Sequence, residues 1–288
     1  MIPNENVTCW LDCWKSSLQE TDIITDEMQA IRWNRRADSF AKDMDEERKQ
    51  KKTADFFNLL DEAGFQPSGA TVLDIGCGTG SLSIPLAQAG AEVTSLDISS
   101  AMLDRLMEVA EHEGLHITPI ECSWWTADID KLGFRNRFDL VIASMTPSIK
   151  DVETFNRMMA CSKKYCYYSN FIRKNPDKIP RDVYVKILGK APQSDTFAAG
   201  LLYPFMYLYT LGFHPIIKLY HKSVRREQDW SESAEKAIDF LLLSQPLSDE
   251  KKEQIREYYK NSSTDGRYNA DYEKYSGMLI WPVDTPVR

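Results

Sequence analysis

The chain has 288 residues, 43% of them hydrophobic, and a formal net charge of −8 at pH 7. This length allows one large domain with additions or two compact domains, and the apolar content is ample for a core. The acidic balance argues against a nucleic-acid-binding surface, and no apolar run approaches the ~20 residues that a membrane span needs.

The N-terminal segment shows no basic region and no apolar signal-like core, and the six cysteines are most simply read as reduced thiols. We therefore expect a cytoplasmic protein without nucleic-acid or membrane partners. Cys9 and Cys13 stand four positions apart beside Trp10 and Trp14, so on a helix the two thiols would share a face. Two thiols alone are weak evidence for zinc. We expect no metal site here, and the segment is better explained as docking its tryptophans on the body.

Residues 26–63 are expected to form two helices, so that residues 1–63 make up an N-terminal helical cover. The first helix is indicated by apolar residues at roughly helical spacing: Met28, Ile31, Trp33, Ala37, Phe40 and Ala41. The alternative for the whole block is simple packing against the domain that follows.

The most informative stretch runs from Val72 to Gly80. Apolar, strand-like residues surround Asp74, glycines follow at 76, 78 and 80, and residues 81–87 read as a helix start. A strand, a glycine turn and a helix bring backbone N–H groups close to a ligand. The spacing is G-x-G-x-G; a dinucleotide fingerprint would need another glycine where Ser81 stands, and no P-loop lysine follows. An acidic residue facing this loop suits a ligand that carries an amine better than a pyrophosphate.

A second carboxylate, Asp97, ends the next expected strand, residues 92–96, and lies 23 positions after Asp74. A carboxylate there can accept both ribose hydroxyls of a nucleoside cofactor. The alternative is that Asp97 caps the helix expected from Ser99 or Ser100 onward.

The rest of the chain continues the alternation of strands and helices. Strands are expected at 117–121, 138–144 and 165–169, with a helix at 152–160. An antiparallel pair at 215–220 and 277–281 would close the sheet. The pattern predicts an α/β fold with a doubly wound, mostly parallel, seven-stranded sheet. Residues 64–288 would form this domain, with helical insertions at about 171–213 and 223–274.

The string Val72–Gly80 resembles motif I of class I S-adenosylmethionine-dependent methyltransferases, hydrophobic-hydrophobic-Asp/Glu-x-Gly-x-Gly-x-Gly. Residues 33–40 resemble the Trp-x3-Ala-x2-Tyr segment of small-molecule members, with Phe40 in place of the tyrosine. The resemblance implies a Rossmann-like fold that binds S-adenosyl-L-methionine and releases S-adenosyl-L-homocysteine. It implies cofactor contacts from Asp74, Gly76, Cys77, Gly78, Gly80, Asp97, Ile98, Met102, Ser123, Trp124, Trp125, Ser144, Met145, Trp33 and Phe40.

Within that set, the resemblance places Asp74 and the glycines around the methionine part, Asp97 at the ribose, and Ile98 with residues 123–125 around the adenine. Many members carry an Asp after the third strand for the adenine amino group. This chain has none there, so Ser123 or a backbone N–H would take its place. The sequence leaves open which of Trp124 and Trp125 faces the ring.

The expected function is methyl transfer to a small molecule. Residues 145–148 lack the Asn/Asp-Pro-Pro-Tyr form of many enzymes that methylate nucleobase or glutamine nitrogens. The alternatives are a non-catalytic cofactor-binding module or subunit and, less favoured, a nicotinamide-dependent oxidoreductase. Catalytic residues are not assigned; Tyr203 and Tyr207, four apart in an apolar stretch, are candidates to line a substrate pocket, or else ordinary core residues. The acceptor and the oligomeric state stay open.

Overall fold

The computed structural model describes residues 4–17, 25–42, 46–174, 182–189, 200–242 and 246–284. The chain separates into two compact units. Unit 1 comprises residues 1–170, 197–218 and 277–288, and unit 2 comprises residues 171–196 and 219–276. The N-terminal segment expected as a cover thus belongs to the same unit as the glycine loop. Unit 2 contains the whole of the second expected insertion, 223–274, and residues 171–196 of the first.

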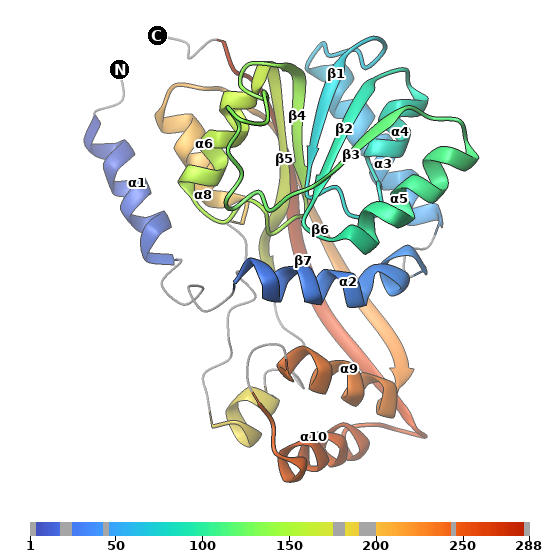
Figure 1. Ribbon diagram of the computed structural model, residues 1–288. Helices are drawn as coiled ribbons and strands as arrows, with labels where there is room; N and C mark the ends of the chain where they lie inside the picture. The colour runs from blue at the N-terminus through green and yellow to red at the C-terminus, as the bar shows by residue number, and fades with distance from the viewer. Residues whose placement is uncertain are drawn as a thin grey trace. The chain divides into compact units, whose positions relative to one another are not determined.

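One seven-stranded sheet with the order β3-β2-β1-β4-β5-β7-β6 organises the fold (Figure 1). The pairings of β1 with β2 and β4, of β2 with β3 and of β4 with β5 are all parallel. This confirms the predicted fold class. The strands are β1 Thr71–Ile75, β2 Glu92–Asp97, β3 Ile117–Glu121, β4 Phe138–Ser144, β5 Ser162–Lys174, β6 Ile216–Asp229 and β7 Arg267–Pro282.

Helices cover both faces of the sheet: α4 and α5 lie on one side of it and α6 and α8 on the other (Figure 1). Apolar strands buried on both faces are what such a parallel sheet requires. The helices are α1 Asn4–Ser17, α2 Asp26–Lys42, α3 Glu46–Glu62, α4 Ser83–Gln88, α5 Ser100–His112, α6 Val152–Cys161, the π-helical turn η1 Val183–Ile187, α8 Leu202–Thr210, α9 Trp230–Leu242 and α10 Asp249–Asn261.

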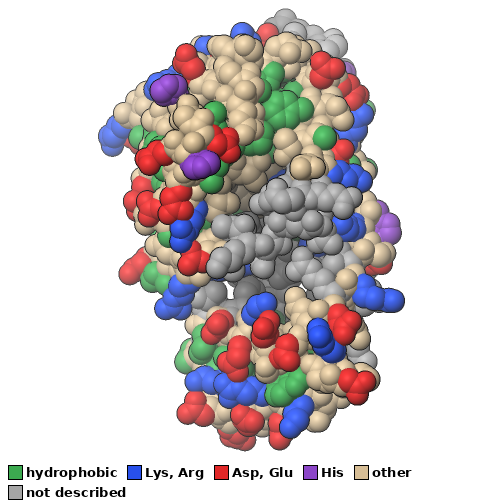
Figure 2. Space-filling view, turned by 90° about the vertical axis from the view of Figure 1, so that its right-hand side faces the viewer, with side chains coloured by type: hydrophobic (Ala, Val, Ile, Leu, Met, Phe, Trp, Pro, Cys, Tyr) green, Lys and Arg blue, Asp and Glu red, His purple; other side chains and the backbone are tan. Residues whose placement is uncertain are grey.

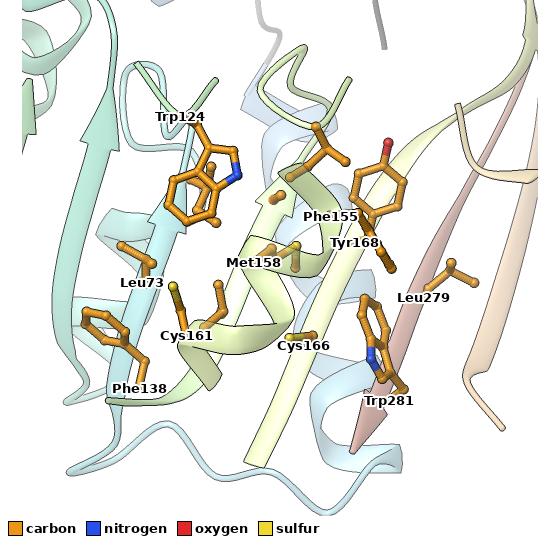
Figure 3. Packing of buried hydrophobic residues seen from close by; sticks show 14 of the residues in the cluster. Leu73, Trp124, Phe138, Phe155, Met158, Cys161, Cys166, Tyr168, Leu279 and Trp281 are labelled. Atoms are coloured by element: carbon orange, nitrogen blue, oxygen red, sulfur yellow. The ribbon is translucent and has the colours of Figure 1, made fainter. Parts of the chain in front are cut away.

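The main core lies between the sheet and α6, and aromatic side chains dominate it (Figure 3). Phe155 of α6 is fully buried between the rings of Tyr168 on β5 and Trp281 on β7, with centroid distances of 5.9 and 5.5 Å. Each such ring contributes about 1.5–3 kcal/mol through burial. The capping box of Asp151 and Thr154 fixes the start of α6 and so places Phe155 on the sheet.

The last two strands extend further than the apolar pattern predicts, since β6 runs to Asp229 and β7 begins at Arg267. Residues 221–229 and 267–274 are mostly polar, so the hydrophobic pattern does not signal strand there. Between them lie the two expected helices, α9 and α10. In unit 2 these pack a small core that includes Ile238, Ile255 and Tyr259.

Helix α1 docks through one of its two tryptophans. Trp14 is 1% exposed, stacks on Tyr203 of α8 at 6.3 Å, and meets the edges of Phe155 and Tyr207. Cys9 and Cys13 are both exposed. Within the described part of the chain, no helix combines the length and the apolar character needed to cross a membrane.

Candidate functional site

The glycine loop after β1 is pressed against the end of β4. The amides of Gly76 and Cys77 both donate to the Leu96 carbonyl oxygen, at 2.7 and 3.1 Å. Gly76 has φ +65°, and a Cβ on it would lie 2.1 Å from Thr146 Oγ1. Gly78 also has positive φ, but a Cβ there would meet no described atom within 4 Å. The loop therefore closes on the body at Gly76 and faces open space at Gly78.

Asp74 lies at the carboxyl end of β1 and is 3% exposed. Ser83 Oγ donates to Asp74 Oδ2 at 2.7 Å and itself accepts from Ser95 Oγ at 2.8 Å. Burial raises the pKa of Asp74 to about 7; Ser83 lowers it, the charge of Asp97 raises it and Lys52 of α3 lowers it. An acid with such a pKa titrates near neutrality and would be driven to its charged form by a ligand cation.

Asp97, at the end of β2, is 7% exposed and connects two segments. Gly78 N–H donates to its Oδ2 and Ser99 N–H to its Oδ1, each at 2.9 Å. Burial raises the pKa of Asp97, and these backbone hydrogen bonds oppose the shift. The cap of α5 is Ser99, whose Oγ accepts from Met102 N–H at 3.1 Å. The carboxylate of Asp97 thus supports the cap and retains further acceptor capacity.

Helix α2 bridges two loops of the site. Asn34 Oδ1 accepts from Ser99 Oγ at 2.7 Å, at the end of β2. Two turns earlier, Asp26 Oδ2 accepts from Thr126 Oγ1 at 3.1 Å, in the segment after β3. The apolar periodicity of α2 does not reveal these two polar contacts. The sequence could have indicated them by spacing, because Asp26 and Asn34 lie on the same side of the helix as the buried Ala37.

The structure separates the two neighbouring tryptophans. Trp124 is 2% exposed, belongs to the main core and donates from Nε1 to the Thr154 carbonyl oxygen at 3.1 Å. Trp125 is half-buried, donates to the Pro147 carbonyl oxygen at 3.1 Å, and has Lys150 Nζ 4.5 Å from its ring. Ser123 Oγ accepts from Trp125 N–H at 3.2 Å. Trp125 therefore links the segment after β3 to the segment after β4.

The end of β4 holds a compact polar turn. Ser144 and Ser169 share a hydroxyl hydrogen bond of 2.9 Å, and Met145, at φ +54°, donates from its N–H to the Ser169 carbonyl oxygen. Thr146 is buried and donates to Ser148 Oγ at 2.9 Å. Positive φ in a residue with a bulky side chain stores strain that often marks a functional turn. Thr146 and Ser148, which the sequence reasoning omits, are the groups that face Gly76.

Most of the expected cofactor residues thus gather at the carboxyl ends of β1, β2 and β4. Met102 is buried in the first turn of α5, and Trp33 is half-buried on α2. The Phe40 side chain lies outside the described residues. Tyr203 and Tyr207 both contact the ring of Trp14. Tyr203 also lines a groove of about 980 Å³ along α1. Among the described residues, no group of three or more His, Cys, Asp or Glu side chains could hold a metal ion.

Comparison with known proteins finds similarity to methyltransferases. A family model described as a methyltransferase domain matches residues 72–164. An uncharacterized protein of Haemophilus influenzae is 25% identical over 88% of this chain and 90% of its own length. A magnesium-protoporphyrin O-methyltransferase of Synechocystis is 42% identical over 74 residues, which are 26% of this chain and 30% of that enzyme. The crystal structure of a candidate methyltransferase from Bacillus halodurans superposes with a TM-score of 0.52 and 15% identity, over 81% of this chain and 100% of that one.

Proposed function

We propose that this chain, in which a methyltransferase-domain model matches residues 72–164, is a class I S-adenosylmethionine-dependent methyltransferase that methylates a small-molecule acceptor. Its cofactor is S-adenosyl-L-methionine, which supplies a methyl group already activated on a sulfonium. The protein then has to bind, orient and desolvate the two reactants.

The proposal rests chiefly on the buried carboxylates Asp74 and Asp97. They lie at the ends of adjacent parallel strands, burial raises the pKa of both, and the charge of Asp97 raises that of Asp74 further. Two nearby buried carboxylates are expensive without cations. A ligand with an ammonium, a sulfonium and vicinal hydroxyls would offset that cost, and this is the donor set that the cofactor offers. The open space over Gly78 leaves room for it.

Each residue then has a proposed role. Asp74 would accept from the ammonium of the methionine part, and the unused lone pairs of Asp97 would accept from the ribose hydroxyls. Ile98 and Ser123 would border the adenine. Of the two tryptophans, we assign Trp125 to the adenine contact, because the ring of Trp124 is packed inside the hydrophobic core.

Two observations support a small-molecule acceptor: the distribution of surface charge and the name of one relative. Acidic and basic side chains are interspersed on the face shown in Figure 2, and the described basic groups form no continuous stripe there. Nucleic-acid-binding proteins usually concentrate their basic side chains. The Synechocystis relative is named for methylation of a porphyrin oxygen, although it matches this chain over only part of its length.

Two measurements test the proposal. Calorimetry should show binding of S-adenosylmethionine and S-adenosylhomocysteine and none of NAD. Release of S-adenosylhomocysteine should then depend on one member of a panel of small oxygen, nitrogen and sulfur nucleophiles. Methylation of tRNA, DNA or protein in preference to every small molecule would contradict the acceptor class, and NAD binding alone would contradict the cofactor.

A further inference from the structure

One buried amide on α2 has an unused donor beside the proposed site. Gln29 is 3% exposed, and its Nε2 finds no hydrogen-bond partner among the described residues. A buried amide nitrogen without an acceptor costs about as much free energy as a lost hydrogen bond. Such a group in a folded chain calls for a partner.

The orientation of this amide is fixed by its neighbour Trp33. The indole Nε1 of Trp33 donates to Gln29 Oε1 at 3.0 Å. Because an indole N–H is a donor only, the oxygen of Gln29 has to face it and the NH2 has to point elsewhere. Trp33 is itself held, since the guanidinium groups of Arg32 and Arg36 lie 5.3 and 5.2 Å from its ring centroid.

The position of Gln29 follows from the two anchors of α2. It lies three residues after Asp26, which binds Thr126 beyond β3, and five residues before Asn34, which binds Ser99 beyond β2. At 1.5 Å per residue, Gln29 lies ~4.5 Å and ~7.5 Å along the helix from these anchors. Residues three apart share a face of a helix, so the buried Gln29 lies on the side of α2 where Asp26 contacts the segment after β3, near which the adenine contacts are proposed.

We propose that Gln29 is a cofactor-binding residue whose Nε2–H donates to an acceptor atom of the adenosyl group, and that Trp33 is a positioning residue that acts through Gln29. This assignment rests on the proposed function. It explains why a polar side chain occupies a buried position of α2 and why its nitrogen has no partner among the residues that the structure describes. Helix α2 then selects adenosyl ligands and does more than pack against α5.

The test uses the full chain, with calorimetric titration of S-adenosylhomocysteine and of 5′-methylthioadenosine, which keeps the adenosyl group and lacks the amino acid. Gln29→Met keeps the side-chain length and removes both the Nε2 donor and the oxygen that accepts from Trp33. We expect it to weaken both ligands by a similar factor, roughly tenfold, while the melting temperature of the ligand-free protein stays near the wild-type value, because removal of the unpaired nitrogen offsets loss of the Trp33 hydrogen bond. Gln29→Glu keeps the acceptor for Trp33 and replaces the donor by an acceptor, so its loss should be larger. Gln66→Met, the same change at an exposed position, is the control and should change neither quantity.

A double-mutant cycle separates positioning from contact. Trp33→Phe should weaken both ligands in the wild-type background and add no further loss in the Gln29→Met background. Wild-type affinity in Gln29→Met would make Gln29 a packing residue. A loss confined to S-adenosylhomocysteine would move the contact to the amino-acid part and overturn the adenosyl assignment. If the wild-type chain binds neither ligand, the proposed function itself fails, which is a different result from unchanged binding by the variant.

Discussion

The Gly78 amide donates a hydrogen bond to Asp97 Oδ2 at 2.9 Å, so the glycine loop after β1 and the end of β2 are held as one unit. The same carboxylate accepts from Ser99, the N-cap of α5. Asp97 therefore shapes the site through both oxygens before any ligand arrives. This pre-organisation lowers the ordering cost of binding.

Asp97→Ala should weaken S-adenosylmethionine and S-adenosylhomocysteine by more than tenfold. Hydrogen bonds to a charged acceptor are worth ~1.5–3 kcal/mol each, and the loop would also lose its tie at Gly78. Calorimetry gives the affinity, and thermal unfolding shows how much of the loss is structural. A folded Asp97→Ala protein with unchanged affinity would remove Asp97 from the ribose site.

The buried carboxyl of Asp74 predicts a pH dependence. Burial raises its pKa from the ordinary 3.8 to about 7, with Asp97 raising it further and Ser83 and Lys52 opposing the shift. Because the folded state holds this proton more tightly than the unfolded state, the resulting stability is present below the ordinary pKa and is lost as pH rises through about 7. The free energy of unfolding of the ligand-free protein should fall by several kcal/mol across that window, since each pKa unit is worth about 1.4 kcal/mol.

Asp74→Asn is the matched variant for this effect. It should flatten that part of the stability profile and abolish cofactor binding, because a neutral amide cannot replace the carboxylate toward an ammonium. In the wild type, affinity for S-adenosylmethionine should rise with pH and level off above about 7. The measurements are melting temperature and binding affinity at several pH values. An equally steep stability profile in Asp74→Asn would assign the titration to another group.

Two glycines of the loop should fail in different ways. Both have positive φ, so Ala at either costs roughly 1–2 kcal/mol in backbone strain. At Gly76 the added methyl would also collide with Thr146 Oγ1, and Gly76→Ala should destabilise the fold by more than that strain alone. At Gly78 the methyl enters open space, so Gly78→Ala should keep most of the stability and lose cofactor affinity. Urea unfolding and calorimetry on the pair check this, and equal stability losses would contradict the proposed cofactor position over Gly78.

The two adjacent tryptophans provide a similar contrast. Trp124→Ala removes a core ring and should cost ~3–5 kcal/mol of stability. Trp125→Ala removes a half-buried ring and should mainly weaken the cofactor. Chemical denaturation together with affinity measurement on both variants distinguishes the roles. A Trp125→Ala protein with full affinity would refute its placement at the adenine.

The sequence predicted the sheet because its strands are short apolar runs whose pattern is local, as in Val72–Ile75. It could not rank Trp124 against Trp125, since the two are chemically identical neighbours and only their tertiary positions differ. Gln29 gave no signal either, because a polar residue on a helix is expected to face water, and its burial depends on where α2 lies. The ends of β6 and β7 were missed because polar residues form them and pairing with a neighbouring strand, not burial, keeps them extended.

The last prediction concerns the two tyrosines of α8, which the sequence treated alike. Tyr207 is 8% exposed and meets Trp14 and Phe155 edge-on, whereas Tyr203 is half-buried, stacks on Trp14 and lines the groove along α1. Removing the hydroxyl leaves the ring contacts intact, so Tyr203→Phe and Tyr207→Phe should both melt near the wild-type temperature. If the groove admits the acceptor, Tyr203→Phe should lower turnover several-fold with unchanged cofactor affinity, and Tyr207→Phe should retain turnover. Steady-state kinetics on the identified acceptor test this expectation. Full turnover in Tyr203→Phe would mean that α8 only supports α1. The next candidates for substrate contacts would then be Thr146 and Ser148, which face the glycine loop.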